Sequence, residues 1–281
     1  LRMVTLNPAT WMRRDHELGG LAPGRRADIL LLPDLSSFRP RTVICGGRVV
    51  AEEGRLLAPL PSLDWESYGA RPRFEPSLPL EDPRLYPPRA GASPRGAPVI
   101  ELVSAVITRL RWERLQEREG LVGLGGAPEG LLYAALVDRE GGWVSRALVA
   151  GFAGDALEGF ASTYNTTTQL LVLGRDPRAM ARAAARVREM GGGIALVAGG
   201  EVVCEVPLPV CGMMSPGTFE EAVARNRSLS RELESRGYPF HDILYTLLFL
   251  TCDFLPAVRL TPRGVLEVKS GRVLVPSGPP L

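Results

Sequence analysis

The chain has 281 residues, 45% of them hydrophobic, so it can bury one large or two ordinary domain cores and is not disordered as a whole. Its 33 basic and 31 acidic residues are spread along the chain and leave a net charge of +2, which indicates neither nucleic acid nor an anionic membrane as a partner. A small molecule or another protein is the expected partner.

Cysteine usage and apolar runs bear on the cellular compartment. Cys45, Cys204, Cys211 and Cys252 are scattered without a C-x-x-C pair, so the sequence predicts neither a disulfide framework nor a zinc ribbon, but buried thiols in a reducing cytoplasm. The longest apolar stretch, ILYTLLFLTC at 243–252, is shorter than the roughly 20 residues that span a bilayer, and the chain does not begin with a secretory signal pattern. We therefore expect a cytoplasmic protein.

The first 57 residues give few structural signals. A short helical piece is followed by ADILLLPDL at 27–35, which is typical of a buried strand, and by a pair of strands about the Gly46-Gly47 turn. These elements are too few to form a core alone. Residues 58–98 contain ten of the 25 prolines and almost no apolar periodicity, which indicates a linker draped over a surface.

Sequence patterns that predict helices and strands become more frequent from residue 99. TRLRWERL at 108–115 alternates as a half-exposed strand does, and two hairpins are predicted about 140–142 and 199–200. A helix should begin after the N-cap Asp176 and end at Gly191, and a capping box of Thr218 and Glu221 should start a second helix that runs to about Arg236. A third helix at 243–252 and closing strands at 258–275 complete an α+β fold.

The most unusual stretch is FASTYNTTTQLLVLG at 160–174, where five hydroxyl or amide side chains precede an apolar strand. Threonine favours strands, so a structural loop of solvated side chains, whose replacement scarcely alters stability, is one interpretation. A polar surface that contacts substrate is the other. The candidate substrate-facing residues are Asn165, Thr166, Thr167, Thr168 and Gln169.

Several other stretches resemble a known family. TLNPATW at 5–11 and GGLAPGRRADILLLPDL at 19–35 are similar to the exit from the barrel of metal-dependent amidohydrolases, where the last barrel helix leads into a small β-sandwich. MGGGIALVAGGEVVCEVPLPVCGMMS at 190–215 and LTPRGVLEV at 260–268 resemble the C-terminal domain of bacterial adenine deaminases. The resemblance implies hydrolytic deamination of adenine to hypoxanthine and ammonia, a reaction of purine metabolism, at a divalent metal site holding manganese or iron.

The resemblance also implies which groups this chain lacks. Before the strand at 170–173 the family carries a motif like His-Asp-Ser-His-Asn, and residues 165–169 match it without either histidine or the aspartate. The family's metal ligands lie at the ends of barrel strands that would precede Leu1. We therefore expect neither catalytic residues nor a metal or other cofactor in this chain, and manganese or iron in a partner barrel.

The two histidines do not change that expectation. His16 lies in a charged connector and is interpreted as a solvated loop residue, whereas His241 is interpreted as a capping or packing residue at the start of a helix. Because they lie 225 positions apart, they form no metal motif.

Two hypotheses follow from the sequence. In the first, residues 1–57 are the end of an amidohydrolase barrel with part of its flanking β-sandwich, and residues 99–281 are the C-terminal domain of an adenine deaminase, present as a fragment or as one piece of a split enzyme. Such a chain acts on a purine only with the barrel as partner and is not catalytically competent alone. In the second, the chain is a degenerate, non-catalytic binding or assembly module of the family. Homo-oligomerisation is a further option in both.

Overall fold

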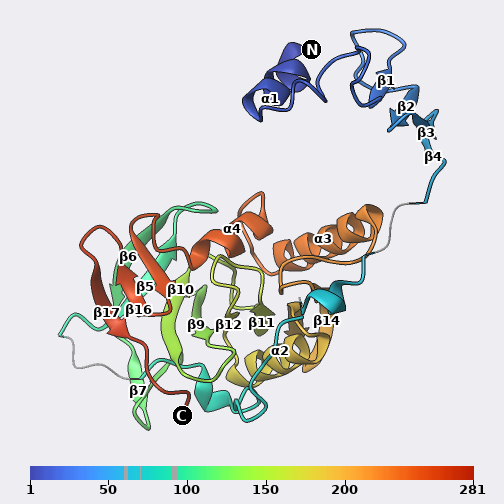
Figure 1. Cartoon of the computed structure of the whole chain (residues 1–281). Coiled ribbons are helices and arrows are strands. Elements are labelled where there is room, and N and C mark those ends of the chain that lie inside the picture. The colour runs from blue at the N-terminus through green and yellow to red at the C-terminus, as the bar shows by residue number, and fades with distance from the viewer. Residues whose placement is uncertain (60–62, 70, 90–93) are drawn as a thin grey trace. The chain divides into compact units, whose positions relative to one another are not determined.

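The computed structural model describes residues 1–59, 63–69, 71–89 and 94–281. The chain divides into two compact units, Leu1–Leu63 and Asp64–Leu281. It is a mixed α/β protein, built mostly of sheets with few helices, and its strands form open sheets without a closed barrel in the described parts (Figure 1). None of the helices there combines the length and the apolarity that a bilayer crossing requires.

The first unit is small and poorly buried. It contains η1 (Arg2–Val4), α1 (Leu6–Trp11) and an antiparallel sheet in the order β1 (Ile29–Leu31), β2 (Thr42–Cys45), β3 (Arg48–Glu52) and β4 (Arg55–Leu56). Only Ala9 and Thr42 are buried among its described residues. The predicted burial of the strand in 27–35 is therefore wrong, because no layer of the unit covers β1 and Leu30 stays 58% exposed.

An eight-stranded sheet forms the centre of the second unit. Its order is β14-β13-β11-β12-β9-β10-β5-β6, and every pair is antiparallel except β10 with β5. The strands are β5 (Ala97–Leu102), β6 (Thr108–Glu113), β9 (Leu131–Val137), β10 (Val144–Ala150), β11 (Gly159–Ser162), β12 (Leu170–Gly174), β13 (Gly193–Ala198) and β14 (Glu201–Pro207). The sheet is mixed, because a single parallel pair interrupts an otherwise antiparallel arrangement.

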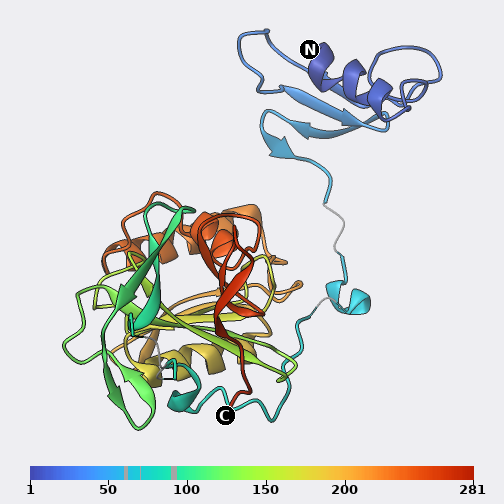
Figure 2. The ribbon, with the colours of Figure 1, turned by 90° about the vertical axis from the view of Figure 1, so that its left-hand side faces the viewer.

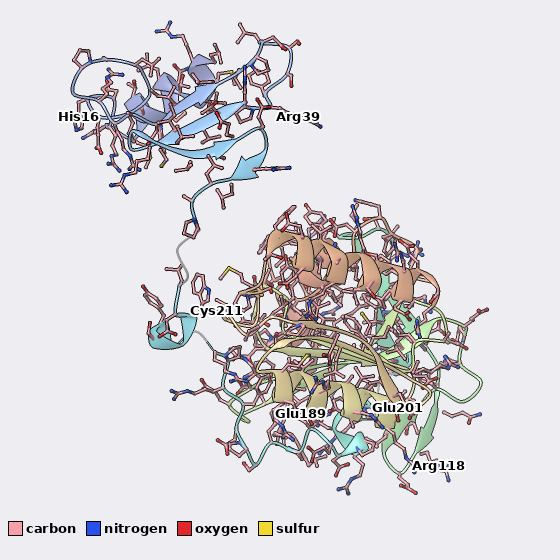
Figure 3. All side chains as sticks on the ribbon, turned by 90° about the vertical axis from the view of Figure 1, so that its right-hand side faces the viewer. His16, Arg39, Arg118, Glu189, Glu201 and Cys211 are labelled. Carbon is pink, nitrogen blue, oxygen red and sulfur yellow. The ribbon has the colours of Figure 1, made fainter. Side chains whose placement is uncertain are left out.

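Layers cover both faces of this sheet, as Figures 2 and 3 show. Alternate residues of each central strand point to opposite faces, so Leu132 and Leu171 belong to one core, whereas Leu131 and Val172 belong to the other. The first core is closed by α3 (Phe219–Glu234), α4 (Ile243–Leu250) and the small sheet β15 (Val258–Thr261), β16 (Gly264–Glu267) and β17 (Arg272–Pro276). The second is closed by α2 (Pro177–Met190).

The segment at 58–98, predicted as a linker, also enters the second core where it is described. η2 (Trp65–Tyr68) and η3 (Pro83–Leu85) form within it, and Leu78, Leu80, Leu85 and Tyr86 are buried beside α2. Hydrophobic periodicity could not predict this packing, because apolar residues between prolines follow neither a helical nor a strand repeat. The short ladder β7 (Gln116–Arg118) with β8 (Leu121–Gly123) lies outside the large sheet.

The helix predictions are confirmed with small changes at the ends. Asp176 accepts a hydrogen bond from the amide of Arg178 at the start of α2, and Gly191 ends that helix with a φ of 71°. Thr218 and Glu221 form the complete capping box of α3, which ends at Glu234. α4 stops at Leu250, two residues before the predicted end.

Candidate functional site

The polar loop at 163–169 connects β11 to β12, two neighbouring strands in the middle of the large sheet. Its backbone is tied to the end of α4, since the amide of Thr166 donates to the carbonyl of Leu248 at 3.3 Å. The Thr166 hydroxyl lies 3.1 Å from that of Thr251, the residue that caps α4. The loop is therefore part of the packed domain.

Asn165 organises the loop from a fully buried position. Its Oδ1 accepts hydrogen bonds from the amide of Thr167 at 3.1 Å, from the Thr167 hydroxyl at 2.6 Å and from the Thr251 hydroxyl at 3.4 Å. Its Nδ2 donates to the carbonyl of Gln169 at 2.8 Å and to that of Ser162 at 3.5 Å. The expectation of a loop made of solvated side chains is therefore wrong at Asn165, whose carboxamide has its hydrogen-bonding capacity filled.

The other four residues lie nearer the surface. Thr166 is exposed, and Thr167, Thr168 and Gln169 are half-buried. Thr168 has a φ of 55°, which is uncommon for a β-branched residue and marks a tightly constrained turn. Gln169 Oε1 accepts from the amide of Arg139 at 2.9 Å, so this side chain also braces backbone.

Among the described residues, Arg139 is the one charged side chain bonded to the loop. Its Nη2 lies 3.5 Å from the Thr168 hydroxyl, and its guanidinium stands 6.0 Å from the centre of the Phe74 ring. Burial lowers its pKa, because a guanidinium loses hydration there. Sequence reasoning missed this neighbour, since about 30 residues separate it from the loop and no local pattern links them.

The chemistry available at 165–169 is limited to hydrogen bonding. Threonine, asparagine and glutamine do not exchange protons near neutral pH, whereas histidine does. These residues can hold a polar ligand or a facing protein surface, but they cannot act as a general acid or base.

Neither histidine lies in this loop. His16 is exposed in the first unit, within the segment where Arg14 pairs with Glu17 at 2.6 Å. His241 is exposed just before α4. Of the capping or packing role predicted for His241, the capping alternative is wrong, because the cap is Asp242, whose Oδ1 accepts from the amide of Tyr245 at 3.0 Å.

A metal does not fit the described residues, among which no three histidine, cysteine or acidic side chains gather in a way that could hold one. Cys204 and Cys252 are buried as predicted, but the prediction of buried thiols is wrong for Cys45 and Cys211, which are exposed. Cys45 is the last residue of β2, before the Gly46-Gly47 turn, and Cys211, labelled in Figure 3, lies in a turn with a φ of 56°.

Comparison with known families decides where the chain belongs. The adenine deaminase C-terminal domain model matches residues 105–272, which is more than half of the chain. The chain belongs to the adenine deaminase C-terminal domain family. The amidohydrolase family model matches residues 1–50. The family resemblance seen in the sequence is thus confirmed.

Curated relatives agree with this assignment. The putative adenine deaminase YerA of Bacillus subtilis is 32% identical over 276 residues, which cover 98% of this chain and 45% of the relative. The adenine deaminase of Rubrobacter xylanophilus is 35% identical over 272 residues, 95% of this chain and 45% of the relative. That of Ruegeria pomeroyi is 32% identical over 275 residues, 96% and 45%. The chain thus spans about half the length of the curated relatives it matches.

Proposed function

We propose that this chain contributes the C-terminal part of an adenine deaminase, in which the hydrolysis of adenine to hypoxanthine and ammonia takes place on an amidohydrolase barrel. The observation that carries the proposal is the family match over 105–272, together with relatives that bear this name and cover nearly the whole chain. The barrel is supplied by a further part of the protein or by a separate chain.

The first unit supports the same proposal. The amidohydrolase model matches it, and its apolar side chains are largely uncovered, with Trp11 84%, Phe38 68% and Leu30 58% exposed. Exposed apolar surface of this kind marks an interface. We assign this unit to the end of the barrel and to part of the β-sandwich that flanks it, so that the rest of that domain covers these side chains.

The metal belongs to the barrel in this proposal, because the described residues of this chain do not fit one. Manganese or iron is the expected ion, and the chain alone is not catalytically competent. The loop at 165–169 contributes polar contacts to the facing barrel surface without moving a proton, since none of its side chains titrates near neutral pH.

One observation favours the second candidate, a non-catalytic assembly module. Asn165 and Thr167 form hydrogen bonds within the loop, and Gln169 accepts one from the backbone amide of Arg139. Side chains of a purely structural turn form hydrogen bonds of this kind. In that case the family motif has been replaced by residues that stabilise the domain.

Reconstitution distinguishes the two candidates. The chain is mixed with a metal-loaded barrel from one of the named relatives, and hypoxanthine production from adenine is followed at matched metal content. The first candidate expects turnover above that of the barrel alone, and none from the chain alone. Binding to the barrel without any gain in turnover would favour the assembly module.

One substitution at an exposed position tests whether the loop takes part in turnover. Thr166→Asp restores the acidic residue of the family motif at an exposed position, and it leaves in place the four hydrogen bonds that Asn165 makes with Ser162, Thr167 and Gln169. Thr166→Asn is the matched uncharged control. If the loop faces the reacting purine, Thr166→Asp raises turnover of the complex by about tenfold or more, whereas Thr166→Asn does not. Equal turnover of both variants and the parent would leave the loop with a structural role only.

A further inference from the structure

Two neighbouring cavities in the second unit share a pair of arginines. The larger has a volume of about 680 Å³ and the smaller one of about 450 Å³, and both are lined by Arg89 and Arg146. The larger volume is within the range of small-molecule sites. Strands β5, β6, β10 and β17, which lie together in Figure 1, contribute to the walls of the larger cavity. Its apolar lining includes Pro98, Trp112, Val144, Leu148, Leu274 and Val275.

Arg146 is a buried cation whose partners in the described structure are all neutral. Only 8% of its surface is exposed. Its Nε donates to the carbonyl of Leu85 at 2.7 Å, and its Nη groups donate to the carbonyls of Pro279 and Pro280. Pro279 lines the larger cavity, so the guanidinium lies at the cavity wall. These four contacts use at most four of the five N–H groups of a guanidinium, and at least one remains for a further acceptor.

Arg89 adds a second positive charge to the same place. It is exposed, and its side chain makes no hydrogen bond or ion pair with the described residues. Burial lowers the pKa of Arg146, and the neighbouring charge of Arg89 lowers it further. By contrast, no arginine among the described residues lowers the pKa of Arg259, which is also buried among carbonyls. An anion between Arg89 and Arg146 would relieve the repulsion between these two like charges.

Acidic groups do not offset these charges in the described linings. That of the larger cavity contains neither Asp nor Glu. In that of the smaller cavity the one acidic residue is Glu119, which lies exposed in the β7–β8 turn and forms no ion pair with either shared arginine. Arg84 also lines the smaller cavity, but it is paired with Asp82 at 2.6 Å. A further guanidinium, that of Arg95, stands 5.9 Å from the centre of the Trp112 ring. A ligand therefore meets positive charge beside an apolar wall.

We propose that these two cavities form one site for an organic carboxylate with an apolar body, such as a medium-chain acid. The carboxylate binds between the guanidinium groups of Arg89 and Arg146, because arginine and carboxylate form strong charge-assisted hydrogen bonds. The body packs against the apolar side chains of the strands and the ring of Trp112. A monoanion is preferred to a phosphate dianion, since the carbonyls already occupy most donors of Arg146. The site does not depend on the proposed function, because it concerns binding to this chain alone.

Calorimetric titration of the 281-residue chain with octanoate tests the proposal, with 1-octanol, acetate and octyl phosphate as comparison ligands. We expect one octanoate per chain, and at least about tenfold weaker binding of octanol, which lacks the anion, and of acetate, which lacks the apolar body. Octanol also measures binding to the apolar side chains that the first unit exposes. Equal affinities for octanoate and octanol, or failure of octanoate to bind at millimolar concentration, would overturn the proposal. Tighter binding of octyl phosphate would overturn the choice of a carboxylate.

Variants at Arg89 locate the site. Arg89→Gln removes an exposed charge without breaking a side-chain bond to the described residues, and it should weaken octanoate binding by at least about fivefold. Arg89→Lys keeps the charge and should retain most of the affinity. Arg118→Gln, at an exposed position of β7 outside both described linings, is the matched control and should leave binding unchanged. If folded Arg89→Gln, checked by circular dichroism, binds octanoate as tightly as the parent does, the assignment is wrong.

Discussion

At the scale of single residues, the local stability of the second unit depends on a few buried polar side chains. Asn165 stands out, because its Oδ1 and Nδ2 bond to groups that come from the loop itself and from the end of α4. The sequence shows its polarity but not its burial, since Thr251 lies 86 residues away. A polar run before a strand indicates a loop equally well when the side chains are solvated and when they are saturated inside the domain.

Asn165→Leu should therefore destabilise the chain by about 3 kcal/mol, because the amide of Thr167 and the carbonyl of Gln169 lose their partners in a buried place. Thr166→Ser, at the exposed neighbour, should change the unfolding free energy by less than about 0.5 kcal/mol. Urea denaturation of both variants measures the difference. A loss below about 1 kcal/mol in Asn165→Leu would show that the network contributes little.

Arg259 is a second residue of this kind, with 1% of its surface exposed. Its guanidinium donates to the carbonyls of Val106, Phe249, Leu255 and Pro256 at 2.6–3.2 Å, and so joins the β5–β6 turn to the segment between α4 and β15. Burial lowers its pKa, because the charge has carbonyl dipoles around it in place of water. The sequence offers no sign of this role, since the residue looks like any strand arginine.

Lysine cannot replace this planar fork of donors, so Arg259→Lys should cost about 2 to 4 kcal/mol although the charge is kept. The matched control is Arg272→Lys on β17, where the side chain is 62% exposed and pairs with Glu267 at 3.4 Å, and where a change below about 0.5 kcal/mol is expected. Thermal and urea unfolding report both. Equal stability of the two variants would mean that water replaces the lost donors without penalty.

At the scale of elements, the sequence predicts best what is decided locally. The ends of α2 and α3 follow from capping residues that bond within three positions, and both helices were found with these caps. The order of the eight strands could not be predicted, because pairs such as β10 with β5 and β11 with β13 join segments that are distant in the chain. The contact of α2 with the sheet is equally non-local.

That contact depends on Gly159 at the start of β11. A Cβ there would lie 2.2 Å from the backbone carbon of Ala179 in α2, so a methyl group requires the helix to move away from the sheet. Gly159→Ala should therefore destabilise the chain by about 3 kcal/mol. Gly125→Ala is the control, because its Cβ would meet open space. Urea denaturation with unchanged stability of Gly159→Ala would show that α2 shifts at no cost.

At the scale of the whole molecule, the two units differ in how much of their own apolar surface they bury. The second unit has two cores on either side of one sheet, and most residues of its central strands are buried completely. The described residues of the first unit form no comparable core, and its apolar side chains at Leu30, Leu31 and Leu56 are each about half exposed. The sequence predicts this poor burial of apolar side chains, because two predicted strand segments and a short helix cannot enclose a core.

Amide hydrogen exchange should reveal the difference. Because burial of apolar area is the main stabilising contribution to a small fold, amides of 29–56 should exchange on the order of 100-fold faster than those of 170–206. Self-association through the exposed apolar side chains would slow exchange in the first unit, so the rates are compared at two protein concentrations with the association state followed by light scattering. A concentration-independent monomer in which residues 29–56 exchange as slowly as 170–206 would mean that the sheet β1–β4 is stable by itself, and its exposed apolar face would then no longer support a barrel or sandwich as the missing cover.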